Sequence, residues 1–343
     1  MSTATLHPSQ ESAATRVVQT LLRSRELAIV IVLALILVVA TTRRSSFVFS
    51  ADGWRDTLLA PSILLLLAVG QMVVVVTRNV DLSVGSTLGI TAYATGKIFV
   101  SNPETSVLVV FAAGLALGAV VGALNGLLVT VFKVPALVIT LGTMYVLRGA
   151  LTHEVGSDRM TAGDYPAHFE KLGNQQVLTI PVLTIIALVV VALVGYYLHT
   201  ARGGRELYAI GSDPDAADLY GLPSGRRVLG AFVLCGALAG LAGVFSAARY
   251  ATAFSGTGSG IELQAVAAVV IGGVAIFGGS GTVWGAAIGA FLLVTINRAL
   301  PILGISEFWQ GAVVGALIIG SIVLDRVLSI RRTHKLVEAR DHA

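Results

Sequence analysis

Charged residues are scarce in this sequence. Of its 343 residues, 23 are Lys or Arg and 19 are Asp or Glu, roughly half the share found in soluble globular proteins. Apolar residue types make up 55% of the chain. Such a chain cannot cover a water-facing surface, which excludes an ordinary soluble globule. The composition therefore predicts an all-α integral membrane protein whose surface faces lipid.

The residues needed for metal, redox and nucleotide chemistry are also few. Cys235 is the only cysteine, so no internal disulfide or paired-cysteine site can form. The six histidines show no HExxH spacing. The Gly96-Lys97 pair is followed by Ile98 rather than Ser or Thr, so there is no phosphate-binding loop. We expect no metal, cofactor or catalytic residue here, and any ATP and Mg²⁺ to be held by partner chains.

One motif resembles the catalytic motif of an enzyme class. Residues 278–281 read Gly-Gly-Ser-Gly, which matches the Gly-x-Ser-Gly of rhomboid intramembrane proteases. Such a serine needs a histidine base on a neighbouring span, and no predicted span contains a histidine. We interpret the motif as a close-packed turn and the chain as a non-enzyme.

Uncharged stretches predict the membrane spans, because a helix needs about 20 apolar residues to cross about 30 Å of hydrocarbon. Residues 57–77, 105–132, 177–198, 228–248 and 308–324 are clear spans, and residues 82–100 and 134–150 are weaker ones. Residues 263–297 are too long for one crossing and predict two spans with a tight turn. Residues 27–42 form a first span or imitate a signal peptide, since basic residues precede them. We favour the span, which gives about ten helices.

The basic residues of the loops predict an orientation. With the N-terminus inside, the inner segments hold 14 of the 23 Lys and Arg residues. We therefore expect a cytoplasmic segment 1–26, a transmembrane domain 27–324 and a basic cytoplasmic tail 325–343.

Two short patterns recur five spans apart. Val80-Asp81-Leu82 opens the third predicted span and Ile261-Glu262-Leu263 opens the eighth, while residues 127–131 resemble residues 292–296. An odd offset turns the second copy upside down, as in transporters built from inverted repeats. The pattern favours two inverted five-helix repeats, although short apolar patterns also recur by chance.

The predicted inner loop 199–227 contains a short capped helix. Ser212 or Asp213 can cap its N-terminus, Pro214 suits its first turn, and Gly221 can end it. A helix of about two turns is marginal in isolation, so defined caps favour a docking partner over a solvated connector.

Polar residues in or beside the spans are candidates for a solute route. Asp81 and Glu262 stand at the mouths of uncharged spans, where they either cap a helix or line a polar path. Amide and hydroxyl groups can bind a sugar or join helices. Together the candidate pathway residues are Asn79, Asp81, Asn125, Thr140, Thr143, Glu262, Asn297 and Gln310. The outer loop 151–176 either meets a binding protein or is a plain surface loop.

Several motifs follow one another in a specific order along residues 55–325. Besides loop 199–227 they are residues 78–86, 125–126, 134–144, 148–149, 258–273 and 278–282. The ordered set resembles permease subunits of ATP-binding cassette importers for ribose, rhamnose and autoinducers, in the branched-chain amino acid and sugar permease superfamily. Residues 276–283 and 304–310 look most like rhamnose-type permeases.

The resemblance implies a fold like that of vitamin B12 importers, in a bacterial inner membrane. It also implies a second permease copy or paralogue, a cytoplasmic ATP-binding cassette ATPase and an extracytoplasmic sugar-binding protein, with no role for nucleic acid. The residues coupling to the ATPase would be Gly211, Asp213, Pro214, Ala216, Ala217, Leu219 and Gly221. The expected function is import of a neutral sugar. The alternative is an ion-coupled secondary transporter of a small polar solute, which needs deep ionisable residues that are scarce here.

Overall fold

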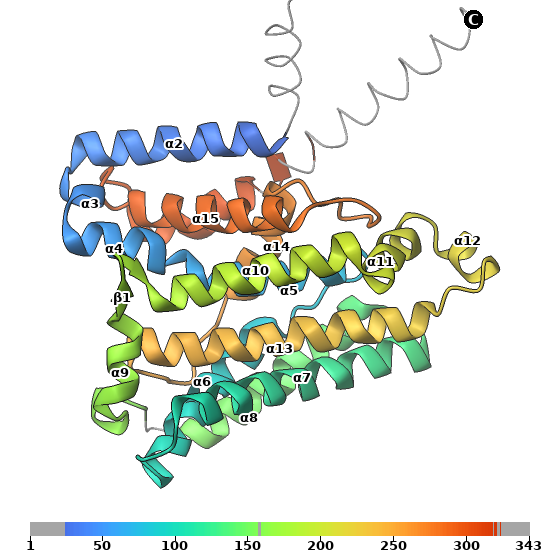
Figure 1. Cartoon of the computed structure of the whole chain (residues 1–343), viewed down its shortest axis with the longest axis horizontal. Helices are drawn as coiled ribbons and strands as arrows, with labels where there is room; N and C mark the ends of the chain where they lie inside the picture. Colours follow the sequence, from blue (N-terminus) through green and yellow to red (C-terminus); the bar gives the residue numbers. More distant parts are fainter. Residues whose placement is uncertain (1–24, 157–158, 318, 321–322, 324–343) are drawn as a thin grey trace, which may run out of the picture.

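The structure is a computed structural model that describes residues 25–156, 159–317, 319–320 and 323. Its long helices run side by side in a bundle (Figure 1). In the described ranges, the helices long and apolar enough to cross a membrane are Glu26–Arg43, Ala51–Val75, Val107–Phe132, Ala136–Val155, Val182–Thr200 and Ser224–Tyr250. Two shorter apolar helices, Ile261–Ile271 and Val283–Ala299, occupy the stretch predicted to hold two spans. An all-α membrane protein is confirmed, and the count of ten stays a prediction.

The labels of Figure 1 follow the chain. The helices are α2 (Arg25–Arg43), α3 (Ser46–Phe49), α4 (Ala51–Leu59), α5 (Pro61–Val75), α6 (Val84–Ser101), α7 (Val107–Phe132), α8 (Ala136–Val155), η1 (Ala162–Asp164), α9 (Ala167–Asn174), α10 (Val182–Thr200), α11 (Arg202–Ser212), α12 (Pro214–Leu219), α13 (Ser224–Tyr250), α14 (Ile261–Ile271), α15 (Val283–Ala299) and η2 (Glu307–Trp309). Strands β1 (Gln176–Val177) and β2 (Ile180–Pro181) form an antiparallel hairpin. We refer to the two ends of the bundle as the α12 end and the α9 end.

The centre of the bundle is α5. Every one of its residues is buried, as expected for a helix that is apolar on all sides. It packs against α13, α15, α14 and α10. In contrast, α2, α7 and α8 expose large apolar side chains such as Leu35, Val120 and Val146. These peripheral faces suit lipid or another protein.

Glycines set the contact between α7 and α13. A Cβ atom on Gly118 would overlap the carbonyl oxygen of Gly236 and lie 2.8 Å from the backbone nitrogen of Gly240. A Cβ on Gly122 would lie 3.1 Å from the Cα of Val233. Lipid supplies no hydrophobic drive between helices, so close backbone approach through small residues provides the attraction. This contact explains part of the high glycine content.

The helix contacts of the first predicted half recur between the corresponding helices of the second. Exchange of the two predicted halves replaces α5 by α13, α6 by α14 and α7 by α15. The contacts of α13 with α7 and α6 then become those of α5 with α15 and α14, and all four contacts are present. These contacts agree with two structural repeats, and the inversion of one repeat relative to the other stays a prediction.

The predicted outer loop 151–176 contains folded segments. Helix α8 continues to Val155, and Leu151 is fully buried. Within the loop, Phe169 on α9 is also fully buried and its ring lies 4.8 Å from that of Phe99 on α6. The charges between these residues suggest water, but the aromatic and aliphatic side chains fold the segment onto the bundle.

Three predicted segments fall wholly or partly outside the described residues. These are the N-terminal segment 1–26, the last span 308–324 and the tail 325–343. Residues 310–317 of the last span are helical. At the other end of the chain, α2 begins at the α12 end of the bundle (Figure 1).

Candidate functional site

A non-helical stretch, residues 76–83, interrupts the chain between α5 and α6, and we call it the broken segment. Buried irregular backbone in a membrane protein needs partners within the protein. Gln71 on α5 supplies them. With its amide oriented to suit both groups, its nitrogen donates to the carbonyl oxygen of Asp81 at 3.0 Å and its oxygen accepts from the Asp81 backbone nitrogen at 3.1 Å.

Four predicted pathway residues meet around the broken segment. The Asp81 carboxylate accepts hydrogen bonds from the backbone nitrogen of Ser83 at 2.9 Å and from its hydroxyl at 2.6 Å. Asn125 on α7 donates to the Ser83 hydroxyl at 2.9 Å and accepts from Thr143 on α8 at 2.6 Å. Thr140 donates to the carbonyl oxygen of Val80 at 3.2 Å. This network, Asp81–Ser83–Asn125–Thr143, joins the broken segment to two peripheral helices.

The network is buried, and most of its hydrogen-bonding groups are occupied by each other. Asp81, Ser83 and Asn125 are each at most 1% exposed. Asn79, the fifth candidate nearby, donates to the carbonyl and hydroxyl oxygens of Thr77. Within the network, as the structure describes it, the second carboxylate oxygen of Asp81 is the buried side-chain atom without a hydrogen-bond partner. The arrangement therefore ties the broken segment to α7 and α8, and a role of these residues in a solute route stays a prediction.

Glu262 lies at the start of α14, close to the start of α6. One carboxylate oxygen accepts from the backbone nitrogen of Gly260 at 3.1 Å, and the other is buried without a partner in the described part of the chain. A side chain on Gly85 would collide with this carboxylate, so the first turns of α6 and α14 touch. Nearby, Arg148 on α8 donates to the carbonyl oxygen of Thr257 at 2.7 Å. Among the described residues, no hydrogen bond joins Glu262 to the Asp81 network.

The two remaining candidates, Asn297 and Gln310, line a separate cavity of about 620 Å³ that we call the polar cavity. It lies between the ends of α13 and α15, the starts of α5 and α14, and residue 310. Its other polar side chains are Ser246, Arg249, Tyr250, Thr252, Thr257, Ser259, Gln264 and Arg298. Its lining, as far as the structure describes the chain, includes no Asp or Glu.

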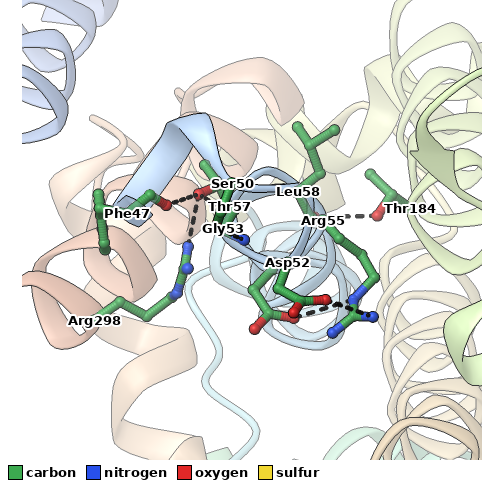
Figure 2. Close-up of polar contacts among 10 residues, drawn as sticks. Phe47, Ser50, Asp52, Gly53, Arg55, Thr57, Leu58, Thr184 and Arg298 are labelled. Atoms are coloured by element: carbon green, nitrogen blue, oxygen red, sulfur yellow. Dashed lines mark hydrogen bonds and ion pairs between the residues drawn. The ribbon is translucent and has the colours of Figure 1, made fainter. Parts of the chain in front are cut away.

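Arg298 fixes one wall of the polar cavity. Figure 2 shows its guanidinium reaching Thr57 on α4, to whose hydroxyl it donates at 2.9 Å. It also lies 4.8 Å from the centre of the Phe47 ring. On the other side of α4, Arg55 pairs with Asp52 at 3.2 Å. The two contacts of Arg298 attach α15 to α4 and α3, the short helices at the α9 end of the bundle.

The predicted capped helix is α12, at the opposite end of the bundle (Figure 1). Asp213 is its N-cap and accepts from the backbone nitrogen of Ala216 at 3.0 Å, Pro214 is its first residue, and Gly221 has a φ of +72°. All three agree with the predicted start, first turn and end. Gly221 adopts the left-handed conformation that favours glycine.

The side chains of α12 are unequally exposed. Among the predicted coupling residues, Ala217 is 4% exposed and packs into the bundle core. Leu219 and Tyr220 are 88% and 87% exposed. A docking partner would therefore meet these two large side chains, while Ala217 holds α12 against the bundle.

Helix α11 precedes α12 and was not predicted. It is tied to α13 by an ion cluster in which the buried carboxylate of Glu206 accepts from Arg202 at 2.7 Å and from Arg227 at 2.5 Å. These two hydrogen bonds hold the pKa of Glu206 below its ordinary value. The four-residue spacing of Arg202 and Glu206 was the available signal in the sequence.

Comparisons with known proteins show the following. Residues 55–322 match the family model described as branched-chain amino acid transport system / permease component. The chain is 36% identical over 308 residues to an autoinducer 2 import system permease protein of Enterobacter sp. (strain 638), covering 90% of this chain and 88% of that protein. It is 35% identical over 297 residues to the ribose import permease protein of Escherichia coli (strain K12), covering 86% and 92%. A probable ABC transporter permease of Sinorhizobium fredii is 34% identical, covering 87% and 88%. No solved structure matches.

Proposed function

The chain belongs to the family of branched-chain amino acid transport system permease components, and from this membership we propose that it is the membrane subunit of an ATP-driven importer of a neutral sugar. The relatives support the substrate class, because two of them are permeases for ribose and for autoinducer 2. None of the three is a rhamnose permease by its description, so the proposal does not extend to rhamnose.

The polar cavity supports a polyhydroxylated solute. Amide groups such as those of Gln264, Asn297 and Gln310 both donate and accept hydrogen bonds, which is what a sugar hydroxyl requires. Arg249 and Arg298 add donors that can reach two neighbouring oxygens at once. We assign the cavity to the entry of the sugar, on the side where a sugar-binding protein delivers it.

The observation that carries the coupling mechanism is the exposed apolar tip of α12. A surface-exposed leucine next to an equally exposed tyrosine, on a helix held by its caps, suits insertion into a groove of another protein. The proposed partner is a cytoplasmic ATP-binding cassette ATPase, which makes the α12 end cytoplasmic. Closure of two ATPases around ATP would move α12 and thereby shift a pair of permease subunits between outward-open and inward-open states.

The alternative, an ion-coupled transporter, draws its support from Asp81 and Glu262. Each has a buried carboxylate oxygen without a partner among the described residues. Ion-coupled transporters use such groups for protons or cations. In that case uptake into vesicles would follow an imposed ion gradient and need no ATPase.

The test is reconstitution with the ATPase and the sugar-binding protein expressed from the same genetic locus. We expect the complex to import ribose or a related sugar only with ATP. Replacing Leu219→Glu should remove the apolar tip and lower both ATPase co-purification and uptake at least tenfold.

Leu178→Glu is the matched control. Leu178 is 90% exposed, like Leu219, but it lies in the turn between β1 and β2 at the other end of the molecule. The control should leave ATPase co-purification unchanged. Wild-type assembly and uptake in Leu219→Glu would contradict docking through α12, and uptake driven by an ion gradient alone would favour the alternative.

A further inference from the structure

Three backbone segments meet at the α12 end of the bundle, and we call their contact the clasp. The segments are the start of the broken segment at Val76, the end of α11 at Gly211 and Ser212, and the turn at Gly278 and Gly279. The backbone nitrogen of Gly279 donates to the carbonyl oxygen of Val76 at 2.9 Å. A Cβ atom on Gly211 would overlap that oxygen and lie 2.7 Å from the Gly279 nitrogen. The three backbones touch directly.

Arg78 closes the clasp with its side chain. Its Nε donates to the carbonyl oxygen of Gly211 and its Nη2 to that of Ser212, both at 2.6 Å. The last carbonyl groups of a helix have no donors within the helix. A cation placed there is also stabilised by the negative end of the helix dipole. The forked guanidinium therefore fits the end of α11 better than a single ammonium group would.

The backbone of Arg78 shows that this placement is imposed by the surroundings. Its φ is +64°, in the left-handed region that non-glycine residues seldom occupy. A side chain on Gly278 would lie 3.0 Å from the Arg78 backbone nitrogen, so glycine is needed on the facing turn. Strained backbone of this kind persists only where neighbouring contacts hold it.

The clasp lies between the two parts of the protein that transport has to connect. Ser212, which accepts from Arg78, is followed directly by Asp213, the N-cap of α12. Three residues after Arg78, Asp81 begins the network that reaches α7 and α8 through Asn125. One side chain thus joins the docking helix to the irregular backbone in the middle of the bundle.

We propose that Arg78 is the positioning residue that passes the movement of α12 to the broken segment. The proposal rests on the proposed function, since it assigns the route of a coupling that the function requires. When α12 and the end of α11 move with the ATPase, the two hydrogen bonds pull residue 78 along. The broken segment follows, and the Asp81–Ser83–Asn125–Thr143 network carries the shift to α7 and α8.

The experiment compares Arg78→Ala, Arg78→Gln and Arg78→Lys in the reconstituted complex with ATPase and sugar-binding protein. Four quantities are measured: ATPase co-purification, basal ATP hydrolysis, its stimulation by the sugar-loaded binding protein, and uptake. For Arg78→Ala we expect normal assembly, basal hydrolysis within about twofold of wild type, and at least a roughly tenfold loss of stimulation and uptake. Lys and Gln should restore part of the coupling, because each can donate to one of the two carbonyls.

Two further variants make the test specific. Arg205→Ala is the matched control. Arg205 lies on α11, the helix whose end Arg78 contacts, and it also donates to a backbone carbonyl at 2.6 Å, that of Thr200, without reaching the broken segment. It should couple normally. Gly211→Ala keeps Arg78 in the sequence but pushes the end of α11 away from Val76. It should lose stimulation and uptake as Arg78→Ala does.

The outcomes distinguish this inference from the proposed function. If the wild-type complex fails to bind an ATPase or import a sugar, the proposed function is wrong. If the wild type transports and Arg78→Ala transports equally well, only the role of Arg78 is wrong. Loss of assembly or of membrane insertion in all three Arg78 variants would make it a folding residue and would also overturn the proposal.

Discussion

The contact between α7 and α13 can be tested by adding one methyl group to Gly236. The Cβ atom of Gly236→Ala would overlap the carbonyl oxygen of Gly118 and lie 2.8 Å from the Cα and nitrogen atoms of Gly122. All the nearest atoms belong to the backbone, so no side chain can rotate away. The two helices would have to separate by roughly 1 Å, which removes close contacts along their length.

The expected size of the effect follows from two opposing contributions. Overpacking a tight contact costs about 1–3 kcal/mol and occasionally more. Alanine is a better helix former than glycine by about 1 kcal/mol, which offsets part of this cost. Gly230, on the same helix, gives the matched control, because a Cβ atom added there would have no neighbouring atom within 4 Å. Gly230→Ala should be neutral or stabilising by up to about 1 kcal/mol. Because the gain in helix propensity is common to both variants, their stabilities should differ by the overpacking cost, roughly 1–3 kcal/mol.

The assay is unfolding of the purified protein in detergent micelles, followed by circular dichroism as the fraction of a denaturing detergent rises. Gly236→Ala should unfold at a lower fraction than wild type, and Gly230→Ala at the same or a higher fraction. Gly240→Ala should repeat the loss, because its Cβ would overlap the carbonyl oxygen of Gly114. If Gly236→Ala were as stable as Gly230→Ala, backbone contact would not hold α7 to α13.

Two further predictions concern the ion cluster and the orientation. Arg202 and Arg227 hold the pKa of Glu206 below its ordinary value of 4.5, so the stabilisation by its charge is present above that value and is lost as the pH falls through the lowered pKa. Wild type should therefore be more heat-resistant than Glu206→Gln at neutral pH and equal to it in strong acid, and a constant difference would contradict the ion cluster. For the orientation, Ser329→Cys in a Cys235→Ala background should react with a membrane-impermeant thiol reagent only after cells are permeabilised, and labelling of intact cells would place the tail outside.

The parts of the structure that depend on local sequence could be predicted. Uncharged stretches located the long apolar helices, because the hydrocarbon core excludes charge over a fixed length. The ends of α12 were also predictable, since Asp213, Pro214 and Gly221 each act on the backbone within a few residues. In these cases the deciding interaction lies inside the segment itself.

Helix α11 was missed because its sequence resembles a loop. Gly203 and Gly204 lower helix propensity, and charged residues surround them. The glycines allow α11 to pack closely against α10, because a side chain on Gly204 would lie 2.5 Å from the Cα of Leu198. Packing against α10 and the ion cluster of Glu206 stabilise a helix that local propensity disfavours.

The grouping of the polar residues could not be predicted from the sequence either. Asn125, Thr143 and Asp81 were candidates singly, but their meeting depends on the rotation of α7 and α8 about their axes. Ser83 was overlooked, although a serine two residues after an aspartate commonly bonds to it. Asn297 and Gln310 belong to the polar cavity and Glu262 to neither group, so the predicted pathway residues do not form a single site.

The distribution of rigid and irregular segments indicates where movement can occur. The glycine contacts of α7 and α13 leave no space for sliding, so these helices should move together as a body. Irregular backbone near the end of α11 includes the broken segment 76–83 and residues 272–282 between α14 and α15. Both stretches reach the end of α11, one through Arg78 and the other through Gly279. A displacement of α12 and the end of α11 would therefore act directly on both irregular stretches, as well as on the faces of α10 and α13 against which α11 and α12 pack. Direct contact with both stretches suits the proposed ATPase, which would act from this end of the protein.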